Sequence, residues 1–133
     1  MLDTSLSVEK LREVHTSIYD TKIVNKTPIL RNVEKLFHLK HENIELHLKL
    51  ESMQAFGSFK TRGVVNQIEK LKSLGQTDKL FSFSAGNYGK AFASYCSLNN
   101  IPGTVFIPDS APNSRATYIK VNNYCFIYCI TFE

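Results

Sequence analysis

The sequence predicts an α/β protein with a parallel sheet that carries helices on both faces, in three layers. β-prone runs and amphipathic helical stretches alternate between residues 45 and 130, and this alternation is typical of parallel sheets with right-handed crossovers. The composition fits a globular domain, because 43% of the residues are hydrophobic and 21% are charged. The length of 133 residues predicts a single domain.

The first fifty residues predict one helix and two extended segments. Residues 7–20 place apolar side chains at steps of three and four, which predicts a helix, and Ser7 is suited to cap it. Residues 27–30 are expected to be extended, because Pro28 fixes its own φ and disfavours helix for the residue before it. Residues 45–50 alternate polar and apolar side chains, which predicts a strand with one buried face.

Helices and strands alternate in the rest of the chain. The apolar side chains Val64, Val65, Ile68 and Leu71 mark one face of a helix that ends before Gly75. The elements expected after it are a strand at 80–84, a helix through 92–98, a strand at 103–107, a helix at 111–120 and a β-prone run at 125–130. With the strand at 45–50, they complete the alternation on which the parallel sheet is predicted.

The charge pattern argues against nucleic-acid and membrane partners. Lys and Arg number 16 against 12 Asp and Glu, but the two signs are interleaved along the chain. No apolar run approaches the roughly 20 residues of a membrane-spanning helix, and no secretory signal opens the chain, so a cytoplasmic protein is expected. Three cysteines without CxxC spacing fit reduced thiols. His38 and His41 lack the partners of a metal site, so no metal is predicted.

The first candidate for chemistry is Lys60, in the motif Ser58–Gly63. The motif lies between a predicted strand and a predicted helix, where ligands of parallel α/β sheets bind. The positive end of the helix dipole disfavours the charged form of a lysine there, and the neutral amine is the nucleophilic form. The alternative is an ordinary surface lysine in a basic loop.

The second candidate is the turn Ser84–Gly89, at the next strand-to-helix junction and on the same predicted edge of the sheet. Its glycines allow close backbone approach, and free N–H groups at a helix N-terminus bind anions. Asn87 adds an amide that both donates and accepts. No Gly-Lys-Ser/Thr follows, which excludes a Walker A loop. The alternative is a Gly-rich connecting turn, although this leaves Ser84 and Asn87 unexplained.

Together the two motifs suit an enzyme that uses pyridoxal 5'-phosphate (PLP) on an amino acid. The lysine would hold the cofactor as an imine, and the turn would bind the substrate carboxylate. Ser58–Gly63 resembles the lysine motif of the fold-type II PLP enzymes, which include serine and threonine dehydratases, serine racemase and the tryptophan synthase β chain. Ser84–Gly89 resembles their substrate-carboxylate loop, and Thr27–Ile29 matches their N-terminal Thr-Pro-Leu.

The resemblance implies a role for each matching residue. Lys60 would bind PLP and remove the Cα proton, Phe59 would lie against the cofactor ring, and Asn87 would hydrogen-bond the phenolic oxygen. The residues implied to bind the substrate carboxylate are Ser84, Ala85, Gly86, Asn87 and Tyr88. The implied activity is that of an L-serine/L-threonine dehydratase (ammonia-lyase), which gives a 2-oxo acid and ammonia from a small amino-acid substrate. A homo-oligomer is compatible with this implied activity.

Three residues depart from the family pattern. Ala85 stands where serine racemase carries a serine that acts as the second acid/base, so the resemblance favours a dehydratase over a racemase. Tyr88 replaces a common His and Lys90 a common Gln, which leaves the substrate open among serine, threonine and hydroxyaspartate. A serine racemase-like enzyme and a catalytically silent, truncated isoform that acts as a binding or regulatory fragment remain as alternatives.

The whole chain, residues 1–133, is expected to be a partial fold-type II domain with a divergent tail from about residue 121. The family's Gly-rich phosphate loop and the Ser or Thr that faces the pyridine nitrogen are not found in it. Each missing charge-assisted hydrogen bond costs on the order of 1.5–3 kcal/mol. We therefore expect weak cofactor binding and weak activity from this chain alone.

Overall fold

The computed structural model describes residues 7–39, 43–120 and 125–130. Helix α1 (Val8–Asp20) opens this part of the chain, and the Ser7 hydroxyl accepts a hydrogen bond from the Lys10 N–H at 3.2 Å, as predicted for a cap. Within these ranges, no helix is both long and apolar enough to cross a bilayer.

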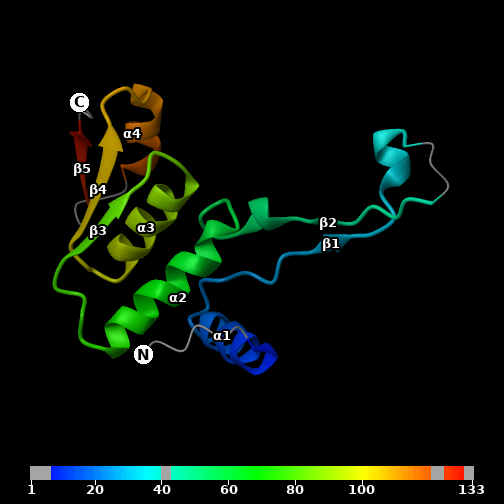
Figure 1. The fold of residues 1–133 in the computed structure, drawn as a ribbon, viewed down its shortest axis with the longest axis horizontal. Helices are drawn as coiled ribbons and strands as arrows, with labels where there is room; N and C mark the ends of the chain where they lie inside the picture. The colour runs from blue at the N-terminus through cyan, green and yellow to red at the C-terminus, as the bar shows by residue number, and fades with distance from the viewer. Residues whose placement is uncertain (1–6, 40–42, 121–124, 131–133) are drawn as a thin grey trace.

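A narrow arm extends from the body between α1 and the second long helix (Figure 1). It contains β1 (Ile29–Leu30), the 3-10 helix η1 (Glu34–Phe37) and β2 (Leu48–Lys49), and the two strands pair antiparallel. The alternation over 45–50 is confirmed, because Leu46, Leu48 and Leu50 are half-buried and the residues between them are exposed.

The predicted place of residues 45–50 in the parallel sheet is wrong. Only Leu48 and Lys49 of this segment form a strand, and their partners lie in β1. The pattern itself contains the reason. Strict polar–apolar alternation suits a half-exposed antiparallel strand, whereas strands of a parallel sheet are covered on both faces and are more uniformly apolar.

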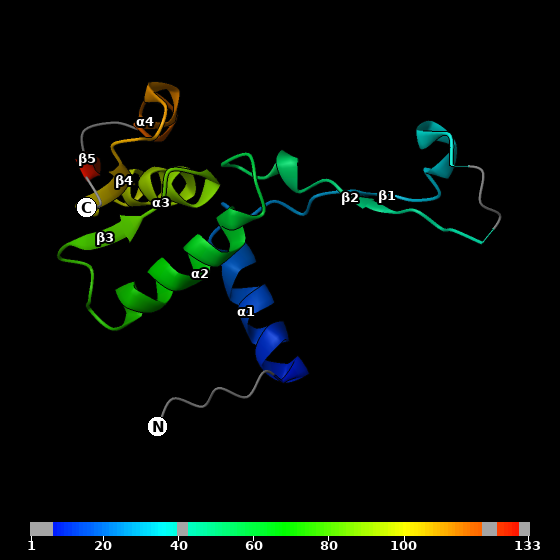
Figure 2. The same ribbon diagram turned by 45° about the horizontal axis from the view of Figure 1, so that its top comes forward.

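The parallel sheet has the strand order β3–β4–β5. Its strands are β3 (Leu80–Phe83), β4 (Gly103–Pro108) and β5 (Cys125–Ile130). Helices α3 (Asn87–Leu98) and α4 (Asn113–Ile119) lie in the two crossovers, and α2 (Lys60–Ser73) packs against α3. Each crossover moves one strand further in the same direction, so crossovers of one hand place both helices on one face (Figures 1 and 2).

The α/β class and the parallel sheet are confirmed, but in the described residues helices cover one face of the sheet and not two. Ser82, Val105 and Ile107 point to the helices and are buried. On the opposite face, Phe81 and Phe83 are 56% and 72% exposed. The second helical layer is absent from this part of the chain because neither crossover reverses direction.

The predicted divergent tail, from about residue 121, contributes to the sheet. Residues 125–130 form β5 and pair with the whole length of β4, from Gly103 opposite Cys125 to Pro108 opposite Ile130. The rest of the tail, 121–124 and 131–133, lies outside the described residues. The tail therefore supplies an edge strand whose β-prone character the sequence predicts.

Candidate functional site

Lys60 is the first residue of α2. A turn with Gly57 at φ +79° precedes the helix, and the 3-10 helix η2 (Glu51–Met53) precedes the turn. Lys60 therefore does not follow a strand of the parallel sheet, in contrast to the prediction. Its side chain is half-buried, and its Nζ lies 4.8 Å from the centre of the Phe59 ring, which is 57% exposed.

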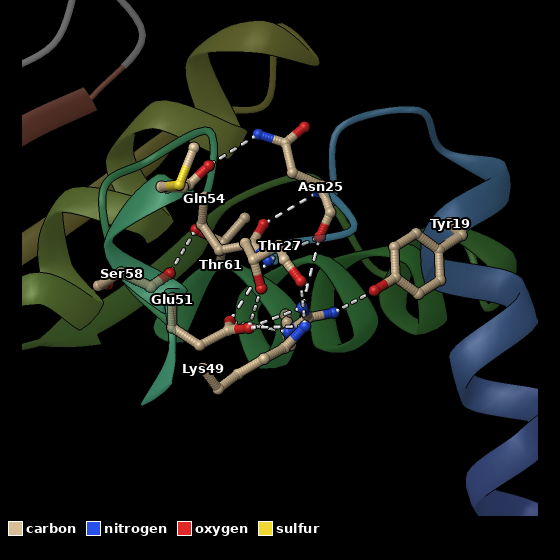
Figure 3. Close-up of polar contacts among 10 residues, drawn as sticks. Tyr19, Asn25, Thr27, Lys49, Glu51, Gln54, Ser58 and Thr61 are labelled. Carbon is tan, nitrogen blue, oxygen red and sulfur yellow. Dashed lines mark hydrogen bonds and ion pairs between the residues drawn. The ribbon is translucent and has the colours of Figure 1, made fainter. Parts of the chain in front are cut away.

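A partly buried ion pair fixes the first turn of α2 (Figure 3). The Arg62 guanidinium donates to both oxygens of Glu51, at 2.9 and 2.8 Å, and to the Tyr19 hydroxyl at 2.7 Å. The Thr27 hydroxyl also donates to Glu51, at 2.6 Å. The planar guanidinium matches the two carboxylate oxygens, which sets both position and orientation. Helix α1, the base of the arm and α2 are thereby joined beside Lys60.

The charges of this ion pair shift the pKa of both groups. Hydrogen bonds from Arg62, above all, lower the pKa of Glu51 from 4.5 to about 2. The carboxylate raises the pKa of Arg62. The sequence analysis missed Glu51 and its pairing, because nothing local in the sequence links residues eleven positions apart across an irregular segment. The one feature of the sequence that could have indicated this ion pair is Arg62, which stands within the lysine motif.

The turn Ser84–Gly89 joins β3 to α3. The Ser84 Oγ accepts hydrogen bonds from the Gly86 N–H at 3.3 Å and from the Gly89 N–H at 3.1 Å, so Ser84 caps α3 from within the turn. A Cβ atom on Gly89 would lie 2.3 Å from the Ser84 carbonyl oxygen, which requires glycine there. Among the described residues, no hydrogen bond engages the N–H groups of Asn87 and Tyr88.

The predicted carboxylate-binding residues therefore divide into two sets. Gly86 directs its N–H at Ser84 inside the turn, whereas the N–H groups of Asn87 and Tyr88 are open to an anion at the helix N-terminus. The Ser84 oxygen accepts from the turn and keeps its own proton to donate. Ala85 is half-buried and contributes only backbone groups.

Helices α2 and α3 pack together with their N-termini at the same end (Figure 1). The Lys90 Nζ, on the first turn of α3, lies 3.9 Å from the position of a Cβ on Gly57, in the turn before Lys60. The Tyr88 hydroxyl donates to the Gln67 side chain of α2 at 2.5 Å. Burial raises the pKa of Tyr88, so its hydroxyl keeps its proton at neutral pH. The structure thus brings the two predicted motifs to one end of a helix pair.

Comparison with known proteins assigns the chain to a family. A family model described as pyridoxal-phosphate dependent enzyme matches residues 21–123, most of the chain. The chain belongs to this family. The prediction of the family is confirmed, and with it the prediction that the family's cofactor is PLP.

Several curated members of the family are similar in sequence. Serine racemase of Bos taurus is 31% identical over 126 residues, which cover 92% of this chain and 36% of the racemase. Catabolic L-threonine dehydratase of Staphylococcus aureus is 30% identical over 115 residues, 86% of this chain and 32% of the dehydratase. L-threo-3-hydroxyaspartate ammonia-lyase of Saccharomyces cerevisiae is 33% identical over 91 residues, which cover 67% of this chain and 26% of the lyase. The chain spans about a third of their length.

Solved structures of PLP enzymes share the fold. Serine racemase from Dictyostelium discoideum has a TM-score of 0.75 at 27% identity, over 95% of this chain and 40% of that protein. A PLP-dependent aspartate racemase has a TM-score of 0.80 over 98% of this chain and 40% of that protein. Its identity of 21% makes it evidence for the fold alone.

The residues at the paired helix N-termini fit PLP chemically. Lys60 supplies an amine for the cofactor's aldehyde, and Phe59 supplies an exposed ring beside that amine. The Ser58 Oγ is buried and makes no hydrogen bond among the described residues, which leaves a donor unused two positions before Lys60. A buried polar atom without a partner is costly, and a polar ligand would relieve that cost.

Proposed function

We propose that this chain is part of a PLP-dependent ammonia-lyase, which converts L-serine or L-threonine to a 2-oxo acid and ammonia. The observation that carries the proposal is the pairing of two N-termini, with the Lys60 amine at α2 and open N–H groups at α3. The similarity to a threonine dehydratase and a hydroxyaspartate ammonia-lyase supports it. Because the chain spans about a third of these relatives, the remaining parts of the site would come from elsewhere.

In this proposal, the residues of the two motifs have separate tasks. Lys60 would hold the cofactor through its side-chain nitrogen and would accept the substrate Cα proton. Phe59 would pack against the cofactor ring, and Asn87 would donate its amide to the phenolic oxygen. The N–H groups of Asn87 and Tyr88, with the Ser84 hydroxyl, bind the substrate carboxylate, and Ala85 and Gly86 shape the turn around it.

The chemistry divides between cofactor and protein. Bound PLP supplies the electron sink that stabilises negative charge at Cα. The protein supplies orientation, with the carboxylate fixed at α3 so that the Cα proton faces Lys60. The β-hydroxyl leaves as water, and a water molecule returns on hydrolysis, so serine gives pyruvate and ammonia. Ala85 has no side-chain proton, which favours elimination over racemisation at this site.

A reduction experiment tests the proposal. The 133-residue chain is incubated with PLP, reduced with borohydride and digested, and the modified lysine is located by mass spectrometry. We expect the adduct on Lys60, its loss in Lys60→Arg, and its retention in Lys70→Arg, which alters an exposed lysine of the same helix. A 2-oxo acid assay on L-serine and L-threonine follows. An adduct on other lysines alone, with none on Lys60, contradicts the proposal.

A second candidate is a catalytically silent fragment with a binding or regulatory role. The exposed aromatic face of the sheet favours it, because the described helices leave that face uncovered. An adduct on Lys60 without 2-oxo acid release supports this candidate. Formation of D-serine at a rate comparable to that of pyruvate would instead support a serine racemase-like enzyme.

A further inference from the structure

A cavity opens on the uncovered face of the parallel sheet. Its volume is about 360 Å³, which is within the range of pockets that hold small molecules. Its lining begins at Lys79 and Pro102, the residues before β3 and β4, and extends to Phe106 and Tyr128. The turn Ser84–Gly89 instead follows the last residue of β3. A ligand of this cavity would therefore be separate from the substrate of the proposed reaction.

Thr104 lies between two aromatic residues of the cavity lining. The strand register places Phe81, Thr104 and Phe126 in one row across β3, β4 and β5. Adjacent strands are about 4.8 Å apart, so the backbones at Phe81 and Phe126 are separated by roughly 9.5 Å. A flat ring needs about 3.5 Å to each neighbour for van der Waals contact. The small side chain of Thr104 therefore leaves room for one planar group between the two aromatic residues.

The Thr104 hydroxyl is a buried polar group of this lining. Thr104 is 3% exposed, although it lies on the face of the sheet that no described helix covers. In the part of the chain that the structure describes, no hydrogen bond engages its hydroxyl. A buried hydroxyl without a partner is costly, and a ligand that carries a hydrogen-bond acceptor relieves that cost.

Lys79 adds a positive charge at one end of the cavity. Its Nζ lies 5.5 Å from the centre of the Phe81 ring, and none of the ion pairs between described residues involves it. An aromatic ring leaves the N–H donors of an ammonium group available. Because Leu80 pairs with Gly103, Lys79 lies one row before Thr104 on the neighbouring strand. A carboxylate between these two side chains gains a charge-assisted hydrogen bond from Lys79 and a second hydrogen bond from Thr104.

The polar groups of the cavity decide among its three conceivable occupants, which are a small ligand, a second copy of this chain and a helix of another protein. An apolar protein surface packed on this face would leave the Thr104 hydroxyl without a partner and would remove the Lys79 charge from water, and both effects are unfavourable. A small carboxylate with an aromatic ring gives both groups a partner and fills the apolar space. The cavity therefore suits the small ligand best.

We infer that this cavity binds a small planar aromatic carboxylate. The ring of the ligand lies between Phe81 and Phe126, and its carboxylate accepts hydrogen bonds from the Thr104 hydroxyl and the Lys79 ammonium group. The inference does not depend on the proposed function, since neither Lys60 nor the turn Ser84–Gly89 lines the cavity. A ligand that binds only the folded chain also stabilises it.

A titration with three matched compounds tests this site. The full chain, labelled with nitrogen-15, is titrated with 2-naphthoate, with its neutral amide and with the saturated, non-planar decahydro-2-naphthoate. We expect saturable NMR shifts for the amides of residues 80–83, 103–106 and 126–128. The naphthoate should bind about fivefold more tightly than the amide, because it alone pairs with a partly exposed charge. It should bind at least about threefold more tightly than the saturated acid, which cannot stack on aromatic rings.

Substitutions assign the affinity to single groups. Thr104→Val removes the hydroxyl with little change of shape and should weaken naphthoate binding about tenfold, whereas Thr104→Ser should restore most of it. Lys79→Gln should abolish the preference for naphthoate over its amide. Phe83→Ser is the matched control, because Phe83 is an exposed aromatic residue of the same face that does not line the cavity, and it should keep the wild-type affinity.

Dispersed spectra of the variants show that they are folded, and Lys79→Gln, which alters an exposed residue, keeps the test valid if Thr104→Val does not fold. Equal affinities for naphthoate and its amide, or an unchanged affinity in Thr104→Val, overturn the inference. Shifts confined to residues 84–90 also overturn it, because they would place the anion at the turn before α3. Shifts of the sheet amides that depend on protein concentration without ligand would instead assign this face to a second copy of the chain and reject the ligand site.

Discussion

The two faces of the β3–β4–β5 sheet differ strongly in how far their side chains are exposed to water. On the covered face, Val105 and Ile107 are 0% and 2% exposed and pack below the helices. On the open face, register aligns Phe83, Phe106 and Tyr128 in one row across the three strands. The rings of Phe83 and Phe106 lie 4.9 Å apart, and those of Phe106 and Tyr128 lie 5.9 Å apart.

The difference shows that apolar character and stabilisation are separate properties. Both faces of these strands carry large apolar side chains, but Val105 and Ile107 below the helices are removed from water, whereas Phe81 and Phe83 stay exposed. Burial contributes roughly 25 cal/mol per Å² of apolar area, so the covered face carries most of the sheet's stability. The open-face rings are held chiefly by cross-strand contacts, each worth up to about 1 kcal/mol. Four substitutions compare the contributions of the covered face, the helical layer and the open face.

Ile107→Ala, on the covered face, should have the largest effect. The side chain is 2% exposed, and its truncation leaves a cavity. The free energy of unfolding, measured by urea denaturation, should fall by about 2–4 kcal/mol. A loss under about 1 kcal/mol would show that the helices do not pack tightly on this face.

Gly89→Ala tests how closely α3 approaches the turn that joins it to β3. The new Cβ would lie 2.3 Å from the Ser84 carbonyl oxygen, so the turn has to move. Thermal unfolding should show a loss of about 1–3 kcal/mol. Gly86→Ala is the matched control, since a Cβ on Gly86 meets no atom within 4 Å and should cost far less. Equal losses in both variants would contradict the close approach.

Glu51→Gln tests an anchor of the helical layer that lies away from the sheet. The pKa of Glu51 is lowered from 4.5 to about 2, so its stabilisation is complete above pH 4.5 and is lost as the pH falls toward 2. The wild-type chain should lose about 1–3 kcal/mol through this group over that interval. Glu51→Gln should be less stable at pH 7 and should lack this part of the pH dependence. Parallel pH profiles of the two proteins would refute the assignment.

Phe83→Ser, on the open face, should have the smallest effect on stability. The side chain is 72% exposed, so the free energy of unfolding should change by no more than about 0.5 kcal/mol. Solubility should rise, because the substitution breaks a contiguous aromatic patch. Static light scattering over a concentration series measures that change. A loss of stability like that of Ile107→Ala would mean that the open face is covered in solution.

Local patterns in the sequence predicted most of the helices and strands but not their distant partners. The apolar spacing around Val64 and Ile68 is a local property, and α2 forms as predicted. The partner of residues 48–49 is not local, since nothing near them identifies residues 29–30. The parallel sheet was therefore predicted correctly from β3 onward, and its first predicted strand belongs to the arm.

The candidate site could likewise be predicted where it depends on local sequence, but not where it depends on distant partners. Lys60, Asn87 and the glycines around them stand in short motifs whose chemistry can be inferred from the sequence. The pairing of Arg62 with Glu51 joins two turns of the chain through side chains alone. The use of Ser84 to cap α3 depends on the exact path of its turn. The roles of these residues in binding PLP and substrate stay predictions.

The arm has a consequence for how the size of this protein is measured. A compact chain of 133 residues has a radius of gyration of about 14 Å, and mass far from the centre enters that quantity as the square of its distance. A monomer with a protruding arm diffuses more slowly than a sphere of equal mass and elutes early from a sizing column (Figure 1). A column calibrated with spherical standards would therefore report a mass above the true 15.1 kDa, whereas sedimentation equilibrium, which depends on mass and not on shape, would give the true value.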